Sequence, residues 1–568
     1  MQALQAQTYT YLENQNPHLL STSVLQYGPI MLQLDETRTK PIRQWLARCR
    51  EETSHNNCHP LAIQWPTTPG VQFRVIDIHR RCITVAPENC RYMALSYVWG
   101  AVDQPKLTVD MSDKLAEEGG LATIWPKMPQ TVRDAIAFCD SLGEQYLWVD
   151  ALCIMQDSPR DMRLSILRMR QIYAAAKCTL SAISASTASA GLSASFIADA
   201  CTCPTADDLY GVIEASPWSS RAWCYQEKVL SHRMIFFTGR GLYMQCQSGV
   251  YSGTGASLPR ENGRPRLDRY NTVGGMLSMN IREGDGLHSY LSAVEHYSSR
   301  ITTKKIDKIN AFQGILKMYK EVMDGVVSTF CFGLPTFAFD LAFCWRAEQH
   351  NPELRNLAFP SWSWLGWDHA VLFDRAMILS KTHTNQMFAP LDGSKQIDIS
   401  SQAGPGFLEI SKLRKPADSY RDPHGFGFPA AMNLFNREPN LRLNASIAKL
   451  SIASKPKGSN GLNNCYAVSP LPSSGTSLPL GYIWLHKKWR EQQEALCTMD
   501  FMALAGKPDM QRPGKWIITM LMCLQVAKDH GFGGHVNEYE RLQVMDCELG
   551  EEAWLKMGGS AKGWIKLG

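Results

Sequence analysis

The sequence has no block of like charge and no apolar run long enough to cross a bilayer. Its 58 lysines and arginines are nearly matched by 53 aspartates and glutamates, so the formal net charge is only +5 over 568 residues. This small, dispersed excess does not favour a nucleic-acid-binding protein. The most apolar run near the C-terminus, residues 516–527, is interrupted by Thr519 and Gln525 and is shorter than the ~20 residues of a membrane helix. We expect no membrane span.

The signature motifs of several enzyme classes are also missing. The sequence contains no Gly-x-Ser-x-Gly, no Gly-rich phosphate loop ending in Gly-Lys-Ser/Thr, and no Gly-x-Gly-x-x-Gly. Serine hydrolase, P-loop and dinucleotide-dependent redox activities therefore lack their usual marks. We expect the protein to carry no cofactor.

Cysteine is plentiful, with 17 residues at irregular spacing. An odd count in so long a chain indicates reduced thiols more than a disulfide framework. Residues 1–23 are rich in Gln and Asn and lack the apolar segment of a secretory signal. Together these features predict a cytoplasmic protein.

Four residues of metal-ligating types lie close together near the N-terminus, namely Cys49, His55, Cys58 and His59. Their spacing fits no standard zinc finger, and no second Cys-x-x-Cys pair follows them. Small apolar cysteines in a capped turn are the commoner explanation of such a group. The sequence therefore favours no metal site, and whether these side chains bind a metal stays open.

The length and the 45% apolar content predict a globular chain of several structural units, because 568 residues exceed one ordinary core. We expect an N-terminal extension with one helix over residues 1–85 and an α/β core over residues 86–250. A helical and Trp-rich extension follows over residues 251–370. A β-rich C-terminal unit with disordered loops is expected over residues 371–568.

Within the α/β core, apolar strand-like runs alternate with segments of helical periodicity and short links. This alternation predicts a parallel sheet wound by right-handed crossovers. Ligands sit at the carboxyl edge of such sheets, where Asp150 ends a strand and Gly100 permits a sharp turn. The expected strands are residues 73–78, 91–100, 146–150 and 178–184, and the expected helices are residues 129–143, capped by Thr131, and 158–176.

Several local expectations lie outside this alternation. Pro41 is expected to open a helix that runs to Arg50. Residues 151–157 and 201–208 are expected to be loops, and residues 234–246 a hairpin. Residues 291–323 read as two helices broken near residues 302–303. The tryptophans at 362, 364 and 367 are expected on one strand, where they belong to the core more often than to a binding surface.

The best candidates for chemistry lie in residues 219–231. Trp223, Gln226 and Glu227 recur at helical spacing, which would place an aromatic ring and a carboxylate on one face. The simpler explanations are that Glu227 pairs with Arg221 or Arg233 and that Trp223 is core. Cys153 is a weaker candidate nucleophile, because an apolar strand end raises a thiol pKa.

Three long segments resemble, in order, the motifs of the fungal heterokaryon incompatibility (HET) domain proteins. They are Tyr-Met-Ala-Leu-Ser-Tyr-Val-Trp-Gly at residues 92–100, Leu-Trp-Val-Asp-Ala-Leu-Cys-Ile-Met-Gln-Asp at residues 147–157, and Arg-Ala-Trp-Cys-Tyr-Gln-Glu at residues 221–227. The resemblance covers most of residues 41–370. It implies a role in fungal non-self recognition, innate immunity and programmed cell death, with self-association through the core and an unknown partner protein.

The core of that family is itself similar to Toll/interleukin-1 receptor (TIR) domains, which implies a flavodoxin-like α/β fold with a parallel sheet. In enzymatic TIR members a glutamate in a similar helix is required to cleave NAD at the nicotinamide glycosidic bond. The resemblance makes Glu227 the catalytic candidate of an NAD glycohydrolase (NADase), with NAD as substrate. The alternative is a non-enzymatic signalling or scaffold module. The expected substrate-binding residues are Trp99, Gly100, Asp150, Trp223 and Gln226.

Overall fold

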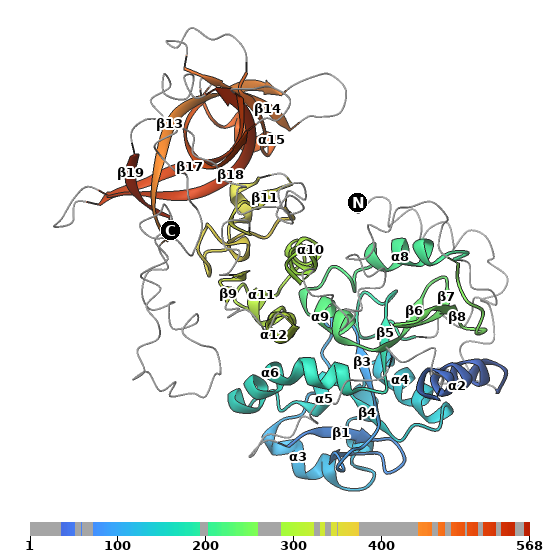
Figure 1. Ribbon diagram of the computed structural model, residues 1–568. Coiled ribbons are helices and arrows are strands. Elements are labelled where there is room, and N and C mark those ends of the chain that lie inside the picture. The colour runs from blue at the N-terminus through green and yellow to red at the C-terminus, as the bar shows by residue number, and fades with distance from the viewer. Residues whose placement is uncertain are drawn as a thin grey trace, which may run out of the picture.

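The computed structural model describes most of the regular elements of the chain, in three successive units (Figure 1). No helix within these described parts is long and apolar enough to span a membrane. The Arg-, Gly- and Asn-rich segment at residues 259–286 is predicted to be a linker or long loop, and it lies largely outside the described residues, as do the expected C-terminal loops. The described residues are 36–51, 58, 72–192, 203–259, 286–322, 330–335, 342–348, 350–373, 441–456, 464–471, 479–494, 497–508, 515–529, 536–550 and 562–567.

The first unit is built on an eight-stranded mixed sheet in the order β2-β1-β4-β3-β5-β6-β7-β8. β3, β4, β5 and β6 are parallel, which confirms the predicted parallel core, and they run in the order 2-1-3-4 when counted along the chain. β1 pairs antiparallel with β2 and β4, and β6 and β7 form the predicted hairpin. The strands are β1 Arg74–Asp77, β2 Cys82–Val85, β3 Tyr92–Ser96, β4 Tyr146–Trp148, β5 Cys178–Ala182, β6 Arg233–Thr238, β7 Gly241–Cys246 and β8 Gly249–Ser252.

Helices cover both faces of this sheet, as expected for parallel strands that are buried throughout. Side chains alternate along β3, so Tyr92 and Ser96 face the same side, where the Tyr92 hydroxyl donates to the Ile172 carbonyl of α6 at 2.5 Å. On the opposite side, Phe138 of α4 packs edge-on against Phe237 of β6. The helices are α2 Glu36–Glu51, α3 Val109–Ala116, α4 Gln130–Ser141, α5 Asp150–Cys153, α6 Pro159–Ala175, α8 Ala206–Glu214 and α9 Ala222–Leu230, with short 3₁₀ turns η2 Gly120–Thr123 and η3 Trp125–Lys127.

Several local predictions for this unit were wrong. Pro41 lies inside α2 and does not open it. Thr131 does not cap α4; it lies within the helix, and its hydroxyl accepts a hydrogen bond from the Gly191 N–H. The expected loop after Asp150 begins with the short helix α5. Part of the expected loop at residues 201–208 belongs to α8, which Thr205 starts through a capping box.

The second unit is helical and rich in tryptophan, and it lies between the α/β unit and the C-terminal sheet (Figure 1). The region predicted as two helices forms three, and the tryptophan run forms a 3₁₀ turn in place of a strand. The tryptophans are core, as predicted: Trp362, Trp364 and Trp367 are almost fully buried. The elements are α10 Gly286–Ser298, α11 Asp307–Asn310, α12 Gln313–Val322, β9 Phe330–Cys331, β10 Leu334–Pro335, β11 Arg346–Ala347, η6 Pro352–Leu354, η7 Trp364–Gly366 and β12 Val371–Leu372.

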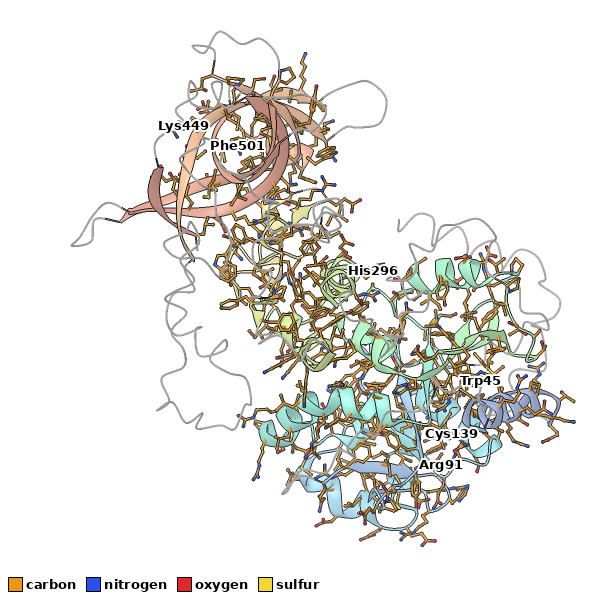
Figure 2. The ribbon with its side chains drawn as sticks, in the orientation of Figure 1. Trp45, Arg91, Cys139, His296, Lys449 and Phe501 are labelled. Atoms are coloured by element: carbon orange, nitrogen blue, oxygen red, sulfur yellow. The ribbon has the colours of Figure 1, made fainter. Side chains whose placement is uncertain are left out.

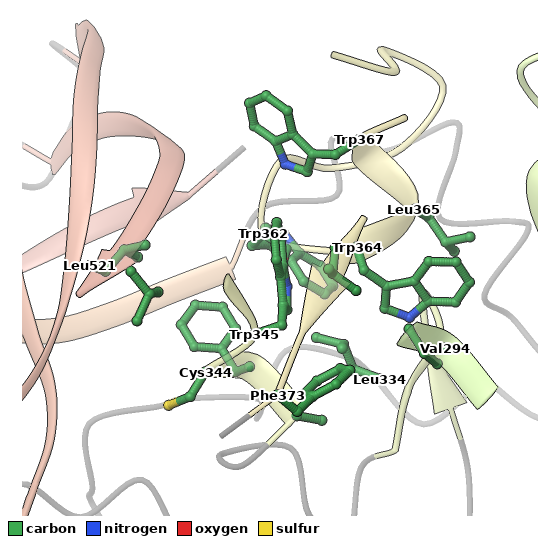
Figure 3. Close-up of a cluster of buried hydrophobic side chains, with 14 of the residues drawn as sticks. Val294, Leu334, Cys344, Trp345, Trp362, Trp364, Leu365, Trp367, Phe373 and Leu521 are labelled. Atoms are coloured by element: carbon green, nitrogen blue, oxygen red, sulfur yellow. The ribbon is translucent and has the colours of Figure 1, made fainter. Parts of the chain in front are cut away.

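The third unit is a seven-stranded, mostly antiparallel sheet, in agreement with the predicted β-rich unit. The sheet closes on itself because β13 also pairs with β14. Its apolar side chains continue the core of the second unit. Figure 3 shows Leu521 of β17 near Trp345 and Trp362 in this shared cluster. The elements are β13 Leu441–Pro456, β14 Cys465–Pro470, β15 Gly481–Trp484, α15 Lys487–Glu491, β16 Cys497–Pro508, β17 Lys515–Asp529, β18 Val536–Gly550 and β19 Lys562–Leu567.

Candidate functional site

Glu227 lies on α9, directly over the carboxyl end of β3. Only 6% of the residue is exposed, and its carboxylate accepts a hydrogen bond from the Ser96 hydroxyl. The Trp218 indole in turn donates to the Ser96 oxygen at 2.8 Å. Ser96 pairs with Ser181 of β5 at the switch point of the sheet. Here the chain leaves β3 toward β4 on one side and leaves β5 toward β6 on the other. Such switch points are the usual ligand sites of open α/β sheets.

Asp150 and Trp99 form the second part of the site. Asp150 follows β4 and keeps part of its surface exposed. Its two carboxylate oxygens accept from the Trp99 indole at 3.2 and 3.0 Å, and one also accepts from the Ala151 N–H at 2.7 Å. The ring of Trp99 is also partly exposed, and the Lys106 ammonium lies 5.5 Å from its centre. Asp150 and Trp99 are therefore brought together at the solvent edge of the site.

The negative charge of Asp150 acts on Glu227, and the positive charge of Arg221 acts on both carboxylates. Burial, together with the negative charge of Asp150, raises the pKa of Glu227 to about 7, against the lowering effects of Ser96 and Arg221. Burial raises the pKa of Asp150 to about 6, although Arg221 and the Trp99 indole lower it. The Arg221 guanidinium stays partly exposed. The site thus holds two carboxyl groups that titrate near neutral pH beside one cation, an arrangement that is common at functional sites.

The structure places the other predicted site residues less centrally. Gly100 has φ +67 and lies on the exposed turn after β3, where an added Cβ would come within 2.8 Å of Thr187 Cγ2. Trp223 is partly buried and packs against both large apolar clusters. Gln226 is 1% exposed and points to a different neighbour, because its Oε1 accepts from the Gly314 N–H of α12 at 2.7 Å.

Comparison with known families bears on this same stretch of chain. Residues 92–227 match the family model described as Heterokaryon incompatibility protein (HET). No curated protein and no solved structure matches the chain. The HET match begins at Tyr92, the first residue of β3, and ends at Glu227. The matched segment therefore contains both carboxylates of the site together with Ser96, Trp99 and Arg221.

Sequence reasoning missed three polar members of this candidate site. Ser96 ends a buried parallel strand, so the edge argument that singled out Asp150 applies equally to it. Ser181 on the neighbouring strand is fully buried, and its hydroxyl has no hydrogen-bond partner among the described residues. Tyr173 of α6 lowers the pKa of Glu227 through its hydroxyl. No sequence pattern marks Tyr173, because its place in the site depends on how α6 packs.

Cys153 is not poised as a nucleophile. The thiol is 3% exposed, and burial raises its pKa to about 12, which leaves it protonated at neutral pH. Its sulfur accepts a hydrogen bond from the Val149 N–H at 3.3 Å. Cys153 is therefore a buried structural residue of the α/β unit.

Proposed function

We propose that this chain is a heterokaryon-incompatibility-type protein of fungal non-self recognition and regulated cell death, and that its HET site cleaves NAD at the nicotinamide glycosidic bond. The observation that carries the reaction is Glu227, a buried carboxyl at the carboxyl edge of β3 with a pKa of about 7. The HET match over residues 92–227 supports the biological role. The flavodoxin-like or TIR-like nature of the core is part of the proposal, and the 2-1-3-4 strand order supports it.

The chemistry suits a buried carboxylate. When the bond between the ribose anomeric carbon and the pyridinium nitrogen breaks, the electron pair goes to the ring and nicotinamide leaves neutral. Positive charge then develops on the ribose, and an ionised Glu227 stabilises that charge in a medium of low dielectric. Water adds to the anomeric carbon and loses a proton to solvent. The reaction thus needs Glu227 in its charged form, which is about half populated at its pKa.

Two further groups fit the substrate. The partly exposed guanidinium of Arg221 offers a positive charge to the diphosphate of NAD. The Asp150–Trp99 pair offers a carboxylate for ribose hydroxyls and an aromatic ring for the nicotinamide. Both keep part of their surface exposed, so a substrate can reach them.

A non-enzymatic scaffold is the second candidate, and the burial of α9 favours it. Gln226, Glu227 and Lys228 are consecutive polar residues, yet each has its own partner inside the protein. Gln226 accepts from Gly314, Glu227 accepts from Ser96, and Lys228 pairs with Glu214 at 2.5 Å. A helix held in this way can be purely structural, and the chain would then act by self-association through its HET core.

Nicotinamide release by the purified full chain separates the two candidates. We expect the wild type to release nicotinamide from NAD. We expect Glu227→Gln to lower the rate of release by at least about 100-fold, which is the usual loss when one stabilising electrostatic contact is removed from a transition state. Glu214→Gln, which changes an acid on the neighbouring helix α8, is the matched control and should keep the rate. Release that persists in Glu227→Gln would refute the assigned site. No release by the wild type, together with preserved toxicity on expression, would leave the scaffold.

A further inference from the structure

Three cysteines from distant parts of the chain meet in the α/β unit. Cys49 lies on α2, Cys58 lies beyond the end of that helix, and Cys246 is the last residue of β7. Their sulfur atoms all lie within 4.8 Å of one another, and all three residues are buried. None of the three takes part in a disulfide in the described part of the chain. The sequence grouped Cys49 and Cys58 with two histidines but gave no reason to add Cys246.

A cation already faces this cluster. The Arg233 Nε, at the start of β6, donates to the Cys49 sulfur at 3.0 Å, and its Nη2 donates to the Cys49 carbonyl at 3.3 Å. Arg233 is itself 7% exposed. A buried guanidinium that donates to sulfur favours the thiolate form, which is the form that binds metals.

The arrangement has the geometry and chemistry of a structural zinc centre. Tetrahedral Zn²⁺ binds thiolate sulfur at about 2.3 Å, which separates ligating sulfurs by about 3.8 Å, so small side-chain movements would close this cluster on an ion. Three thiolates and a neutral imidazole around Zn²⁺ leave a net charge of about −1, which the Arg233 guanidinium would balance. We propose that Cys49, Cys58 and Cys246 bind one Zn²⁺ ion that fastens α2 to the end of β7.

His232 is the described histidine best placed to complete the coordination. It is 7% exposed, and its Nδ1 has no hydrogen-bond partner in the described part of the chain. It directly precedes Arg233, which pairs with Cys246 across the β6–β7 hairpin, so the chain brings His232 next to the cluster. A buried imidazole nitrogen without a partner is costly unless it binds something. His55 and His59 lie outside the described residues, and the experiment below compares them with His232.

The site has a structural purpose that the packing makes clear. Trp45 and Ile42 of α2 are almost fully buried against the α/β core, where Figure 2 labels Trp45. A thiol loses its proton when its sulfur binds a metal ion. An ion that replaces those protons would join the helix to the sheet by coordinate bonds.

The test measures zinc in the full chain, purified under reducing conditions and dialysed against metal-free buffer. We expect one zinc per chain in the wild type and its loss in Cys49→Ser and Cys246→Ser. Cys139→Ala is the matched control, because Cys139, which Figure 2 labels, is equally buried on α4. This variant should retain the metal. His232→Ala is compared with His55→Ala and His59→Ala. The variant that weakens zinc retention most identifies the fourth ligand.

A second measurement keeps the proposal testable if a variant fails to fold. The wild type, stripped of zinc and loaded with Co²⁺, should show thiolate-to-cobalt charge-transfer absorption and the visible bands of a tetrahedral site. Absence of zinc from the wild type with no cobalt signal would overturn the proposal. A disulfide between two of the three cysteines under the same reducing conditions would also overturn it.

Discussion

The buried carboxyl of Glu227 makes the stability of the protein depend on pH, and Glu227→Gln should remove that dependence. The pKa of Glu227 is about 7 in the folded protein, whereas an unfolded chain gives Glu a pKa of about 4.3. Between these values the folded state holds a proton that the unfolded state has released. Folding is therefore favoured at the acid end of this window, and the advantage is lost as pH rises through about 7. Since one pKa unit is worth about 1.4 kcal/mol, ionising Glu227 costs about 4 kcal/mol of the free energy of unfolding.

Glutamine has the size of glutamate and stays neutral, so it does not suffer this loss. We expect the free energy of unfolding of Glu227→Gln, relative to the wild type, to increase by roughly 2.5 kcal/mol between about pH 5 and about pH 8. Urea titrations at the two pH values, followed by tryptophan fluorescence, measure the difference. The variant should thus be more stable than the wild type on the alkaline side, where the proposed reaction is fastest.

Glu214→Gln supplies the opposite case. Burial alone would raise the pKa of Glu214, but the cations of Lys228 and Arg300 lower it to about 2. Glu214 is then ionised in both states from about pH 5 to about pH 8, so Glu214→Gln should lower stability by the same amount at both. If the effect of Glu227→Gln is equally flat with pH, the reasoning about the buried carboxyl is wrong.

Three further substitutions test other contacts. Ser96→Ala removes the hydroxyl that donates to Glu227, so the pH profile of nicotinamide release should move to higher pH by on the order of one unit; an unmoved profile would remove Ser96 from the site. Gly100→Ala forces a Cβ into a left-handed turn against Thr187 and should lower the free energy of urea unfolding by about 2 kcal/mol. Trp364→Ala empties a fully buried position and should cost about 3–5 kcal/mol, seen as a lower thermal unfolding midpoint. Wild-type midpoints would contradict the last two.

The sequence predicted what depends on local periodicity. The strands around Tyr92 and Tyr146 and the helix before Tyr146 follow from apolar spacing, so their alternation and parallel pairing were predictable, whereas α3 was not predicted. The tryptophan run was predicted as core but in the wrong conformation, because its 3₁₀ turn answers to tertiary packing. Spacing also placed Gln226 and Glu227 on one face, whereas the structure directs them to different neighbours.

The candidate site depended more on contacts across the fold. Glu227 and Asp150 could be singled out from the sequence as candidate carboxylates, yet the effect of Asp150 on the pKa of Glu227 required the packing of α9 over β3. The Ser96–Glu227 hydrogen bond joins residues that are 131 apart in the chain. The meeting of Cys246 with Cys49 is of the same kind. Such pairings carry no local pattern, because only the strand order brings them together.

The two-sided burial of α9 decides where the protein can be cut. Glu227 belongs to the candidate site. Tyr225, Val229 and Leu230, on the same helix, belong to the apolar cluster that continues through α10 and α12 to the C-terminal sheet. Tyr225 stacks on Phe312, which directly precedes α12, with ring centres 6.4 Å apart. An expression fragment that stops after β8 would expose this side of α9 to water. Any oligomer formed by such a fragment would arise from the uncovered apolar surface, so tests of self-association need the full chain.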